Sequence, residues 1–559
     1  MALDSEYMEI KWGEDGNPRD VTFNYKDDFN FAYDVVDVIA KRTPDNEAIV
    51  YRDVHGSKKY ISFSEVSKKS DIAASILSMR GIKKGDRVML IMKRRYQYWY
   101  LVMALHKLGA VCIPTSHMVT GEDIADRVEA ADIKAIVCAA DKEICESVKV
   151  AKKVSGRDFL MFTGDATYDG FEYLWDKEDS VDSEFDRVET SVDDPMLLYF
   201  TSGTTGKPKA VMHKYTYPLA HIMTAKYWYG CVDGGRHFTI ADSGWAKSAW
   251  GKLYGQWFCE CAIVVYDYDT FIAREILDII QEERITSFCA PPTIYNYLLR
   301  VNIEEYDLSS VREYVTGGEA MPREIIEAFK KRTGFDIREG FGQTETALLT
   351  ANYTYTKNLS DGIGYASPLY DMIVVDEEDN ELPVGKVGEI AIRFKGDGKI
   401  PIGIFYTYLA DEERYRTVTR HGIYHTGDKG YRDASGGFHF KSRNDDVIKT
   451  SGYRVGPTEV EDVIIRHEAV GEVAVTGFPD IKRGQAIKAS IILKDGYVDD
   501  GKLAGEIREF VRVHAASYKI PRIIEFVAEL PRTTTGKVNR AAIRARDCKK
   551  MTKSCESSP

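Results

Sequence analysis

The chain has 559 residues, of which 44% are hydrophobic and 29% charged, and its formal net charge is -12 at pH 7. This length is too great for a single hydrophobic core, so at least two domains are expected. The acidic balance argues against nucleic acid as the main partner, and the composition is that of an ordinary globular protein.

Cysteine usage and the apolar runs bear on the compartment. Nine cysteines, an odd number spread along the chain, do not have the pattern of a disulfide framework. The first residues, Met-Ala-Leu-Asp-Ser-Glu, are acidic and lack the basic and apolar run of a signal peptide. No uncharged apolar run approaches the roughly twenty residues of a membrane-spanning helix. We therefore expect a cytoplasmic location and no integral membrane association.

The N-terminal part of the chain alternates helical and strand patterns. Ser62 and Glu65 have the spacing of a capping box and predict a helix that continues to Leu77 and stops at Gly81. Further helices are predicted over 31–41 and 96–108, and strands over 88–92, 110–113, 136–137 and 159–162. This alternation indicates an α/β fold, in which helices cover a mostly parallel sheet.

Residues 199–211 read Tyr-Phe-Thr-Ser-Gly-Thr-Thr-Gly-Lys-Pro-Lys-Ala-Val, and the apolar residues before them predict a buried strand that ends where the loop begins. Glycine allows backbone amides to close around an anion, hydroxyls donate further hydrogen bonds, and lysines supply positive charge. The loop is therefore expected to hold a polyphosphate, with a flexible polar turn as the alternative. The positions of Gly203, Gly206 and Pro208 do not match a Walker A loop.

Residues 241–251 read Ala-Asp-Ser-Gly-Trp-Ala-Lys-Ser-Ala-Trp-Gly, a tight turn between two tryptophans. Aromatic side chains offer large apolar surfaces in fixed positions, which suits the wall of a ligand pocket. Packing in the core explains the tryptophans equally well. Lys247 lies between them, and a cation beside an apolar pocket needs a partner or a route to water.

A second dense cluster follows a predicted strand at 314–316. The turn Gly317-Gly318-Glu319 lets the backbone approach a flat ring closely. Further along, the chain reads Ile-Arg-Glu-Gly-Phe-Gly-Gln-Thr-Glu over 337–345. In this stretch Phe341 can stack on a base, Thr344 can donate to a phosphate and Glu345 can bind Mg²⁺. A surface loop is the alternative.

The C-terminal part begins with short strands and turns over 362–443, which predict a small β subdomain. It ends in Tyr-His-Thr-Gly-Asp, whose Asp428 can bind both hydroxyls of a ribose. A helix from Pro457, strands at 472–477, 487–493 and 522–527 and a helix at 504–513 then predict an α+β unit.

The segment from Pro531 to Lys537 and the polar residues after Ile543 are expected to be exposed and mobile. Lys537 alone would be interpreted as an ordinary surface lysine. Its presence together with the other clusters is what indicates a function.

Taken together, five clusters in this order resemble those of the adenylate-forming superfamily along nearly the whole chain. They lie at 199–211, 342–345, 424–428, 443–454 and 531–537. The stretches at 241–251 and 340–346 look closest to medium-chain acyl-CoA synthetases. The resemblance implies an AMP-forming acyl-CoA synthetase, which converts a carboxylic acid, ATP and CoA into acyl-CoA, AMP and pyrophosphate through an acyl-adenylate. The expected acids are short branched to medium-chain ones.

The same resemblance implies the domain organisation. Residues 1–444 would form a large N-terminal domain of mostly parallel sheets with helices and a small β subdomain. Residues 445–559 would form a small mobile α+β domain that rotates between the two half-reactions. Asp445 would be the hinge, and Gly452 would border the tunnel for the pantetheine arm of CoA.

Site roles follow from the resemblance, residue by residue. Lys537 would bridge the carboxylate and the α-phosphate, Thr344 would bind the phosphate, and Glu345 would hold Mg²⁺. The ATP and AMP site would comprise Thr201, Ser202, Gly203, Thr204, Thr205, Gly206, Lys207, Lys209, Gly317, Gly318, Glu319, Glu339, Gly340, Phe341, Asp428, Arg443 and Arg454. The acyl pocket would comprise Trp228, Trp245, Lys247, Trp250, Cys289 and Gly342.

Two positions depart from relatives within this superfamily. Phe341 stands where a tyrosine is common, which keeps the stacking surface and loses a hydroxyl. Gly342 stands where acetate-specific members carry a tryptophan that closes the acyl pocket, so the glycine is expected to leave a channel open.

Other functions share parts of this pattern. An adenylation enzyme that passes the acyl group to a carrier protein, an aryl-CoA ligase and a luciferase would use the same first half-reaction. A non-catalytic nucleotide sensor, from a different class, could keep the phosphate loop but would have no need of Lys537. The expected partners are a small carboxylic acid, ATP and CoA, without nucleic acid, and homodimer formation is left open.

Overall fold

The structure is a computed structural model that describes residues 2–201, 209–319, 321–359, 361–396, 399–443, 446, 448–450, 453–480, 484–515, 519–533 and 536–556. The chain separates into two compact units. Unit 1 takes the described residues within Met1–Gly203, Pro208–Met372 and Arg393–Gly422, and unit 2 takes those within Ile373–Ile392 and Ile423–Pro559. The predicted boundary at residue 445 stays a prediction, because residues 444 and 445 lie outside the described part.

One sheet of unit 1 has the strand order β21-β11-β10-β6-β5-β7-β8-β9. Its strands are β5 (Arg87–Ile91), β6 (Val111–Pro114), β7 (Ile133–Cys138), β8 (Leu160–Thr163), β9 (Glu172–Tyr173), β10 (Pro195–Thr201), β11 (Lys209–Lys214) and β21 (Thr407–Tyr408). Neighbours from β10 to β9 run parallel, and β11 and β21 add an antiparallel edge. The predicted α/β fold with mostly parallel sheets is confirmed.

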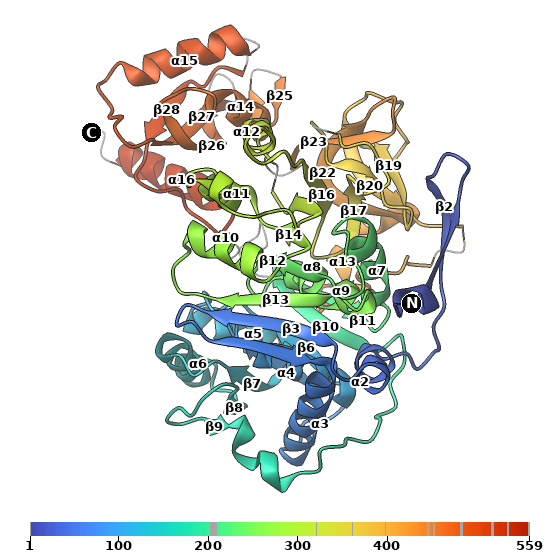
Figure 1. The fold of residues 1–559 in the computed structure, drawn as a ribbon. Helices are drawn as coiled ribbons and strands as arrows, with labels where there is room; N and C mark the ends of the chain where they lie inside the picture. The colour runs from blue at the N-terminus through green and yellow to red at the C-terminus, as the bar shows by residue number, and fades with distance from the viewer. Residues whose placement is uncertain are drawn as a thin grey trace. The chain divides into compact units, whose positions relative to one another are not determined.

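Helices alternate with these strands along the chain, as the sequence predicts (Figure 1). They are α3 (Phe63–Met79), α4 (Gln97–Leu108), α5 (Gly121–Ala131) and α6 (Lys142–Ser155), preceded by the π-helical turn η1 (Ala32–Val36) and α2 (Asp37–Arg42). Helix α4 is buried along almost its whole length. Its run of apolar residues thus belongs to the core beside this sheet.

The predicted capping box at the start of α3 is only half formed. The Ser62 hydroxyl accepts a hydrogen bond from the backbone N–H of Glu65 at 3.2 Å. The carboxylate of Glu65 does not complete the box but accepts from the hydroxyl of Tyr100 at 2.7 Å. Tyr100 comes from α4, so a tertiary contact replaces the local one that the spacing predicted.

The second sheet of unit 1 has the strand order β18-β17-β16-β15-β14-β12-β13-β3-β4. Its strands are β3 (Glu47–Asp53), β4 (Lys58–Ser62), β12 (Arg236–Thr239), β13 (Ala262–Asp267), β14 (Ser287–Cys289), β15 (Glu313–Gly317), β16 (Ile337–Gly342), β17 (Leu348–Ala351) and β18 (Gly364–Ala366). From β16 across to β3 all neighbouring strands are parallel. Because β16 runs to Gly342, the alternative of a surface loop is wrong for residues 337–342, and the next three residues lie in a turn after the strand.

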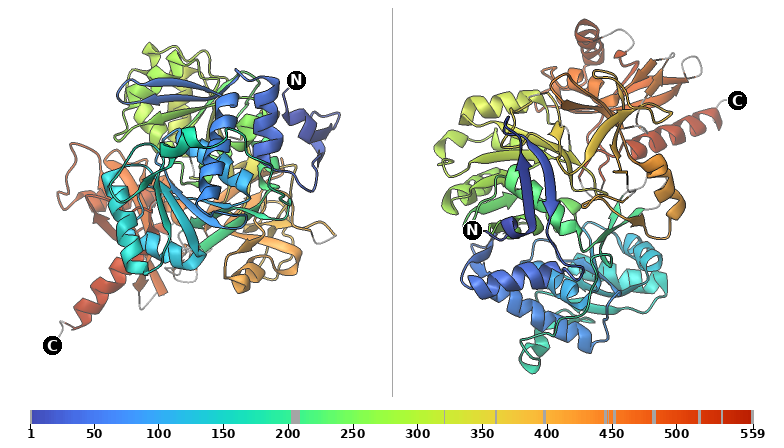
Figure 2. Two further views of the ribbon diagram at one scale, coloured as in Figure 1. Left: turned by 90° about the horizontal axis from the view of Figure 1, so that it is seen from below. Right: turned by 90° about the vertical axis from the view of Figure 1, so that its right-hand side faces the viewer.

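The later α-helices of unit 1 are α7 (Tyr217–Tyr227), α8 (Ala246–Gly251), α9 (Tyr254–Phe258), α10 (Ala273–Glu282), α11 (Pro292–Leu298), α12 (Arg323–Thr333) and α13 (Glu412–Val418). A separate hairpin of β1 (Met8–Trp12) and β2 (Pro18–Phe23) follows the short helix α1 (Asp4–Tyr7) and belongs to neither large sheet; it is dark blue in the views of Figure 2.

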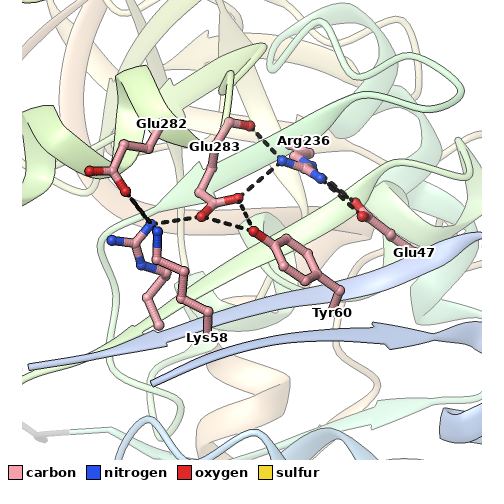
Figure 3. A network of polar contacts seen from close by, with 7 residues as sticks. Glu47, Lys58, Tyr60, Arg236, Glu282 and Glu283 are labelled. Atoms are coloured by element: carbon pink, nitrogen blue, oxygen red, sulfur yellow. Dashed lines mark hydrogen bonds and ion pairs between the residues drawn. The ribbon is translucent and has the colours of Figure 1, made fainter. Parts of the chain in front are cut away.

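An ionic network fixes the C-terminal end of α10 to the second sheet (Figure 3). The carboxylate of Glu283 is almost fully buried and accepts hydrogen bonds from Arg52 at 2.7 Å, Arg236 at 3.1 Å and Tyr60 at 3.2 Å. Arg236 also pairs with Glu47 at 2.8 Å. Removing one partner would leave the buried charge of Glu283 less well compensated, which is destabilising, so the members of the network depend on one another.

Unit 2 contains two groups of strands. The first is β19 (Asp371–Val375), β20 (Gly388–Arg393), β22 (Ile423–Arg432) and β23 (Gly437–Arg443), in that order across the sheet. The second is β24 (Ile448–Thr450), β25 (Tyr453–Val455), β26 (Val470–Asp480), β27 (Gly484–Leu493) and β28 (Ile523–Phe526), with helices α14 (Pro457–Ile464), α15 (Leu503–His514) and α16 (Arg540–Glu556). The predicted β subdomain strands and the α+β unit are confirmed.

The prediction of a mobile tail after Ile543 is wrong for the described residues. They form α16, in which Ile543 and Asp547 are buried. Asp547 pairs at 2.6 Å with Lys488, a buried cation of β27. Arg540 pairs with Glu461 of α14 at 2.7 Å. Polar side chains hold this helix in place, which is why a polar composition did not mean mobility.

The helices also bear on the expectation about membranes. Within the described part of the chain, none of them combines the length and the apolar character needed to cross a membrane.

Candidate active site

The phosphate loop predicted from the sequence is bounded by two neighbouring antiparallel strands. Thr201 ends β10, Lys209 begins β11, and the two residues are directly opposite each other. Ser202, Gly203, Thr204, Thr205, Gly206 and Lys207 lie outside the described residues, so their roles remain predictions. The paired ends of β10 and β11 are those expected for a loop that leaves the sheet and returns to it.

Glu345, the predicted Mg²⁺ ligand, is held by a tyrosine that the sequence did not point to. The hydroxyl of Tyr408 donates to Oε1 of Glu345 at 3.0 Å. Burial and the Glu345 carboxylate raise the pKa of the Tyr408 hydroxyl above its usual range, so it stays protonated and donates. Nζ of Lys209 lies 5.9 Å from the centre of the same ring. Tyr408 therefore links Glu345 to the strand that leaves the phosphate loop.

The link depends on a pairing between distant segments. Strand β21 lies against β11, with Tyr408 opposite Val211. No spacing near Glu345 in the sequence signals this, because Tyr408 is brought in by the edge of the first sheet.

The turn that carries Thr344 and Glu345 is fixed by its backbone carbonyls. The carbonyl of Thr344 accepts from Nε2 of His213 at 2.8 Å, and the carbonyl of Glu345 accepts from the backbone N–H of Phe405 at 2.8 Å. The backbone N–H of Gln343 donates to the Thr346 hydroxyl at 3.0 Å. His213 was also missed at the level of sequence.

The residues predicted to frame adenine meet at the ends of β15 and β16. Gly317 and Gly340 are directly opposite each other in the parallel pair, and Gly318 has φ of 92°, a conformation that favours glycine. The carboxylate of Glu339 accepts from the backbone N–H of Met321 at 3.4 Å. Glu319 and Phe341 are both half-buried. The two strands thus bring these candidates to one sheet edge.

Tryptophan rings pack directly on these glycines. A Cβ at Gly340 would lie 2.6 Å from Cε2 of Trp228, and one at Gly317 would lie 3.1 Å from Cη2 of the same ring. A Cβ at Gly342 would lie 2.3 Å from Cη2 of Trp250. The space expected to form an open channel beside Gly342 is therefore filled by the Trp250 ring in this structure.

The remaining acyl-pocket candidates lie around the same strands. Lys247 donates from Nζ to the carbonyl of Gly317 at 2.8 Å, which supplies the partner that a cation in this place requires. Cys289 ends β14 opposite Val315 and is fully buried. Trp245 precedes α8, and its Nε1 is buried without a hydrogen-bond partner among the described residues. The pocket and adenine candidates of unit 1 therefore adjoin one another.

Unit 2 brings the two predicted ribose ligands together. Asp428 of β22 and Arg443 of β23 are directly opposite each other, with Oδ1 and Nη1 3.5 Å apart. Asp428 is only 3% exposed, and its backbone N–H donates to the hydroxyl of Thr426 at 3.1 Å. A buried carboxylate with one arginine beside it suits a ligand that offers two hydroxyls.

Lys537 lies exposed on a turn of unit 2 whose two sides are paired. Arg532 and Val538 form a bridge, and the backbone N–H of Thr533 donates to the carbonyl of Lys537 at 2.7 Å. Arg454 lies in β25. Asp445 and Gly452 lie outside the described residues, so the hinge and the tunnel remain predictions.

Known proteins resemble this chain along most of its length. The family described as AMP-binding enzyme matches residues 36–398, and the AMP-binding enzyme C-terminal domain matches residues 459–537. A 4-hydroxybutyrate–CoA ligase 1 of Metallosphaera sedula is 36% identical over 537 residues, covering 94% of this chain and 92% of that protein. The mitochondrial acyl-coenzyme A synthetase ACSM5 of Homo sapiens is 34% identical over 528 residues, covering 93% and 90%.

Solved structures agree with this result. The anthranilate CoA ligase AuaEII, in complex with anthranoyl-AMP, superposes with a TM-score of 0.84 at 25% identity, covering 95% of this chain and 99% of that one. An acyl-CoA synthetase of Brucella canis has a TM-score of 0.71 at 25% identity, covering 94% and 95%.

Proposed function

This chain belongs to the AMP-binding enzyme family and is an AMP-forming acyl-CoA ligase, and we propose that it activates short branched to medium-chain carboxylic acids. What supports the choice of acid is the similarity to an acyl-coenzyme A synthetase and a 4-hydroxybutyrate–CoA ligase, together with Gly342, which brings no side chain of its own; the Trp250 ring packed on it would turn aside for a longer acid. An apolar wall in that position would border the hydrocarbon part of an acid whose carboxylate reacts beside Thr344.

The proposed roles follow from the chemistry of the two half-reactions. A carboxylate is a poor electrophile, so one of its oxygens first attacks the α-phosphorus of ATP and pyrophosphate leaves. The CoA thiol then attacks the acyl carbon and AMP leaves with the oxygen. Lys537 would place positive charge between the carboxylate and the α-phosphate, and Thr344 would donate to the same phosphate.

Magnesium is part of the proposal. Glu345 offers the carboxylate oxygens that Mg²⁺ prefers, and the hydrogen bond from Tyr408 orients that carboxylate. Bound there, the ion would supply positive charge to the phosphate oxygens. In unit 2, Asp428 and Arg443 would bind the ribose.

A cytoplasmic location also remains a proposal. The name of one relative places that protein in mitochondria. Fractionation of the source cells is the direct test.

The activity itself has a direct test. Purified protein incubated with acetate, 2-methylbutyrate and hexanoate, Mg-ATP and CoA is expected to release AMP and pyrophosphate and to form acyl-CoA, with the two longer acids preferred. AMP release in multiple turnovers should depend on CoA, because the acyl-adenylate otherwise stays bound. Formation of ADP and an acyl phosphate would contradict the proposal. Turnover that needs a carrier protein in place of CoA would favour the adenylation enzyme.

We propose Asp445 as the pivot between the two half-reactions, and a substitution that restricts φ tests this. Asp445→Pro fixes φ near -65° and is expected to spare one half-reaction and to abolish the other, because a hinge needs to change its dihedral angles. Pyrophosphate exchange measures the first half-reaction, and conversion of supplied acyl-adenylate measures the second. Asp445→Ala, which loses the same carboxylate but keeps φ free, serves as the control. Normal rates of both half-reactions in Asp445→Pro would place the hinge elsewhere.

A further inference from the structure

His213 is the side chain that fixes the backbone of Thr344. It lies in β11, the strand that begins at Lys209, and it is fully buried. Its Nε2 lies 2.8 Å from the Thr344 carbonyl, and because a carbonyl only accepts, Nε2 must carry the proton. Nδ1 is buried and has no hydrogen-bond partner within the described residues. Burial lowers the pKa of His213 to about 4, so the ring is neutral at pH 7 and makes this one hydrogen bond.

The ring of His213 also contacts the wall of the acyl pocket through one tyrosine. The rings of His213 and Tyr217 lie 3.9 Å apart between centres, at an interplanar angle of 32°. The hydroxyl of Tyr217 accepts from Nε1 of Trp250 at 3.1 Å. Both Tyr217 and Trp250 are buried, and the edge of the Trp250 ring rests on Gly342.

These contacts form a closed ring of neighbouring residues. Gly342 and Thr344 belong to one short segment, so the segment is touched at one residue by Trp250 and at the other by His213, and Tyr217 joins the two side chains. Close packing and hydrogen bonding in a buried place leave little freedom for one member to move without the others.

We propose that His213 is a positioning residue for adenylate formation and that Tyr217 couples it to Trp250. A change in the position of Trp250 when the acid binds would then change the position of Thr344. The inference rests on the proposed function. Holding the Thr344 carbonyl fixes the orientation of the peptide that leads into Glu345. The phosphate donor and the Mg²⁺ ligand are therefore placed together before the reaction. A small misplacement of such groups lowers the rate of the chemical step more than it weakens binding.

The first test removes the hydrogen bond and then restores it. His213→Leu is expected to lower kcat for pyrophosphate exchange about tenfold, the effect of one lost hydrogen bond, with little change in KM for ATP. His213→Gln carries an amide N–H at the distance of Nε2 and is expected to recover most of that loss.

The matched control is His106 of α4. It is also fully buried, and burial lowers its pKa to about 3. Within the described part of the chain its ring bonds through Nε2 alone, to the Tyr254 hydroxyl at 2.9 Å. His106→Leu should lower Tm as much as His213→Leu does but leave kcat unchanged. Equal kcat values in the two leucine variants, or a glutamine variant no better than leucine, would overturn the positioning role.

The second test addresses the coupling. Tyr217→Phe removes only the oxygen that accepts from Trp250 and should change the ratio of kcat/KM for hexanoate to that for acetate several-fold, without changing KM for ATP. An unchanged ratio would overturn the coupling through Tyr217. If His213→Leu does not fold, His213→Asn replaces it, since its shorter amide cannot reach the Thr344 carbonyl. A wild-type protein that forms no AMP would refute the proposed function instead, so the two failures are distinguishable.

Discussion

Lys537→Ala is expected to slow adenylate formation by about 10² to 10³, the loss that follows removal of one charge-stabilising group from a transition state. The same variant should convert a supplied acyl-adenylate into the thioester at nearly the normal rate, because the proposed rotation of the C-terminal domain would take Lys537 out of the site for the second half-reaction. Pyrophosphate exchange and single-turnover thioester formation measure the two steps separately.

A control lysine shows whether the effect belongs to this position. Lys502 is another exposed lysine of unit 2, next to the start of α15, and Lys502→Ala should change neither step. Equal losses in both half-reactions of Lys537→Ala would contradict the division of labour. Acetylation of Lys537 removes the same charge and is expected to reproduce the alanine variant.

Gly342→Trp is expected to abolish activity on hexanoate and 2-methylbutyrate while activity on acetate is kept or increased. Each methylene that the pocket buries contributes about 0.8 kcal/mol, so three additional carbons contribute roughly 2.4 kcal/mol, or about fifty-fold in relative kcat/KM. The structure adds a condition, because even a Cβ at this position would meet the ring of Trp250. The proposed preference for longer acids would therefore require that ring to turn aside when they bind.

A pair of variants separates a refilled pocket from a damaged fold. Trp250→Ala should broaden the range of acids that the enzyme accepts. The double variant Gly342→Trp with Trp250→Ala should place an indole ring in the same space again and so favour acetate. Thermal unfolding of each variant measures the cost of the exchange. A wild-type enzyme that already prefers acetate, or a Gly342→Trp variant that keeps its longer substrates, would show that Gly342 does not set the pocket.

Much of the fold followed from local patterns in the sequence. The alternation of apolar runs with helix caps and glycine stops predicted β5, β6, α4, β7 and β8, because these elements are specified by residues within them. The prediction for the tail was wrong for the opposite reason. Its residues are polar, and the helix is held by contacts with distant parts of the chain. Asp547, for example, pairs with Lys488 of β27, far earlier in the sequence.

The same distinction between local patterns and distant contacts applies to the candidate site. Residue types near glycines pointed to Thr344, Glu345 and the phosphate loop, since that chemistry is local to each stretch. Tyr408 and His213 were missed because each acts from another strand, and the partner of Lys247 is a backbone carbonyl, which has no signature in sequence.

The docking of α16 decides where the chain tolerates being shortened. A polypeptide trimmed just after Lys537 would keep every predicted catalytic group and yet lose Ile543 from a small apolar cluster with Ala474 and Leu530. Among the residues that the structure describes, the buried Lys488 would then keep only the more exposed Glu525 as its counter-ion. Helix α16 is thus part of the packed structure of unit 2. A purification tag should be added after α16 and should not replace it.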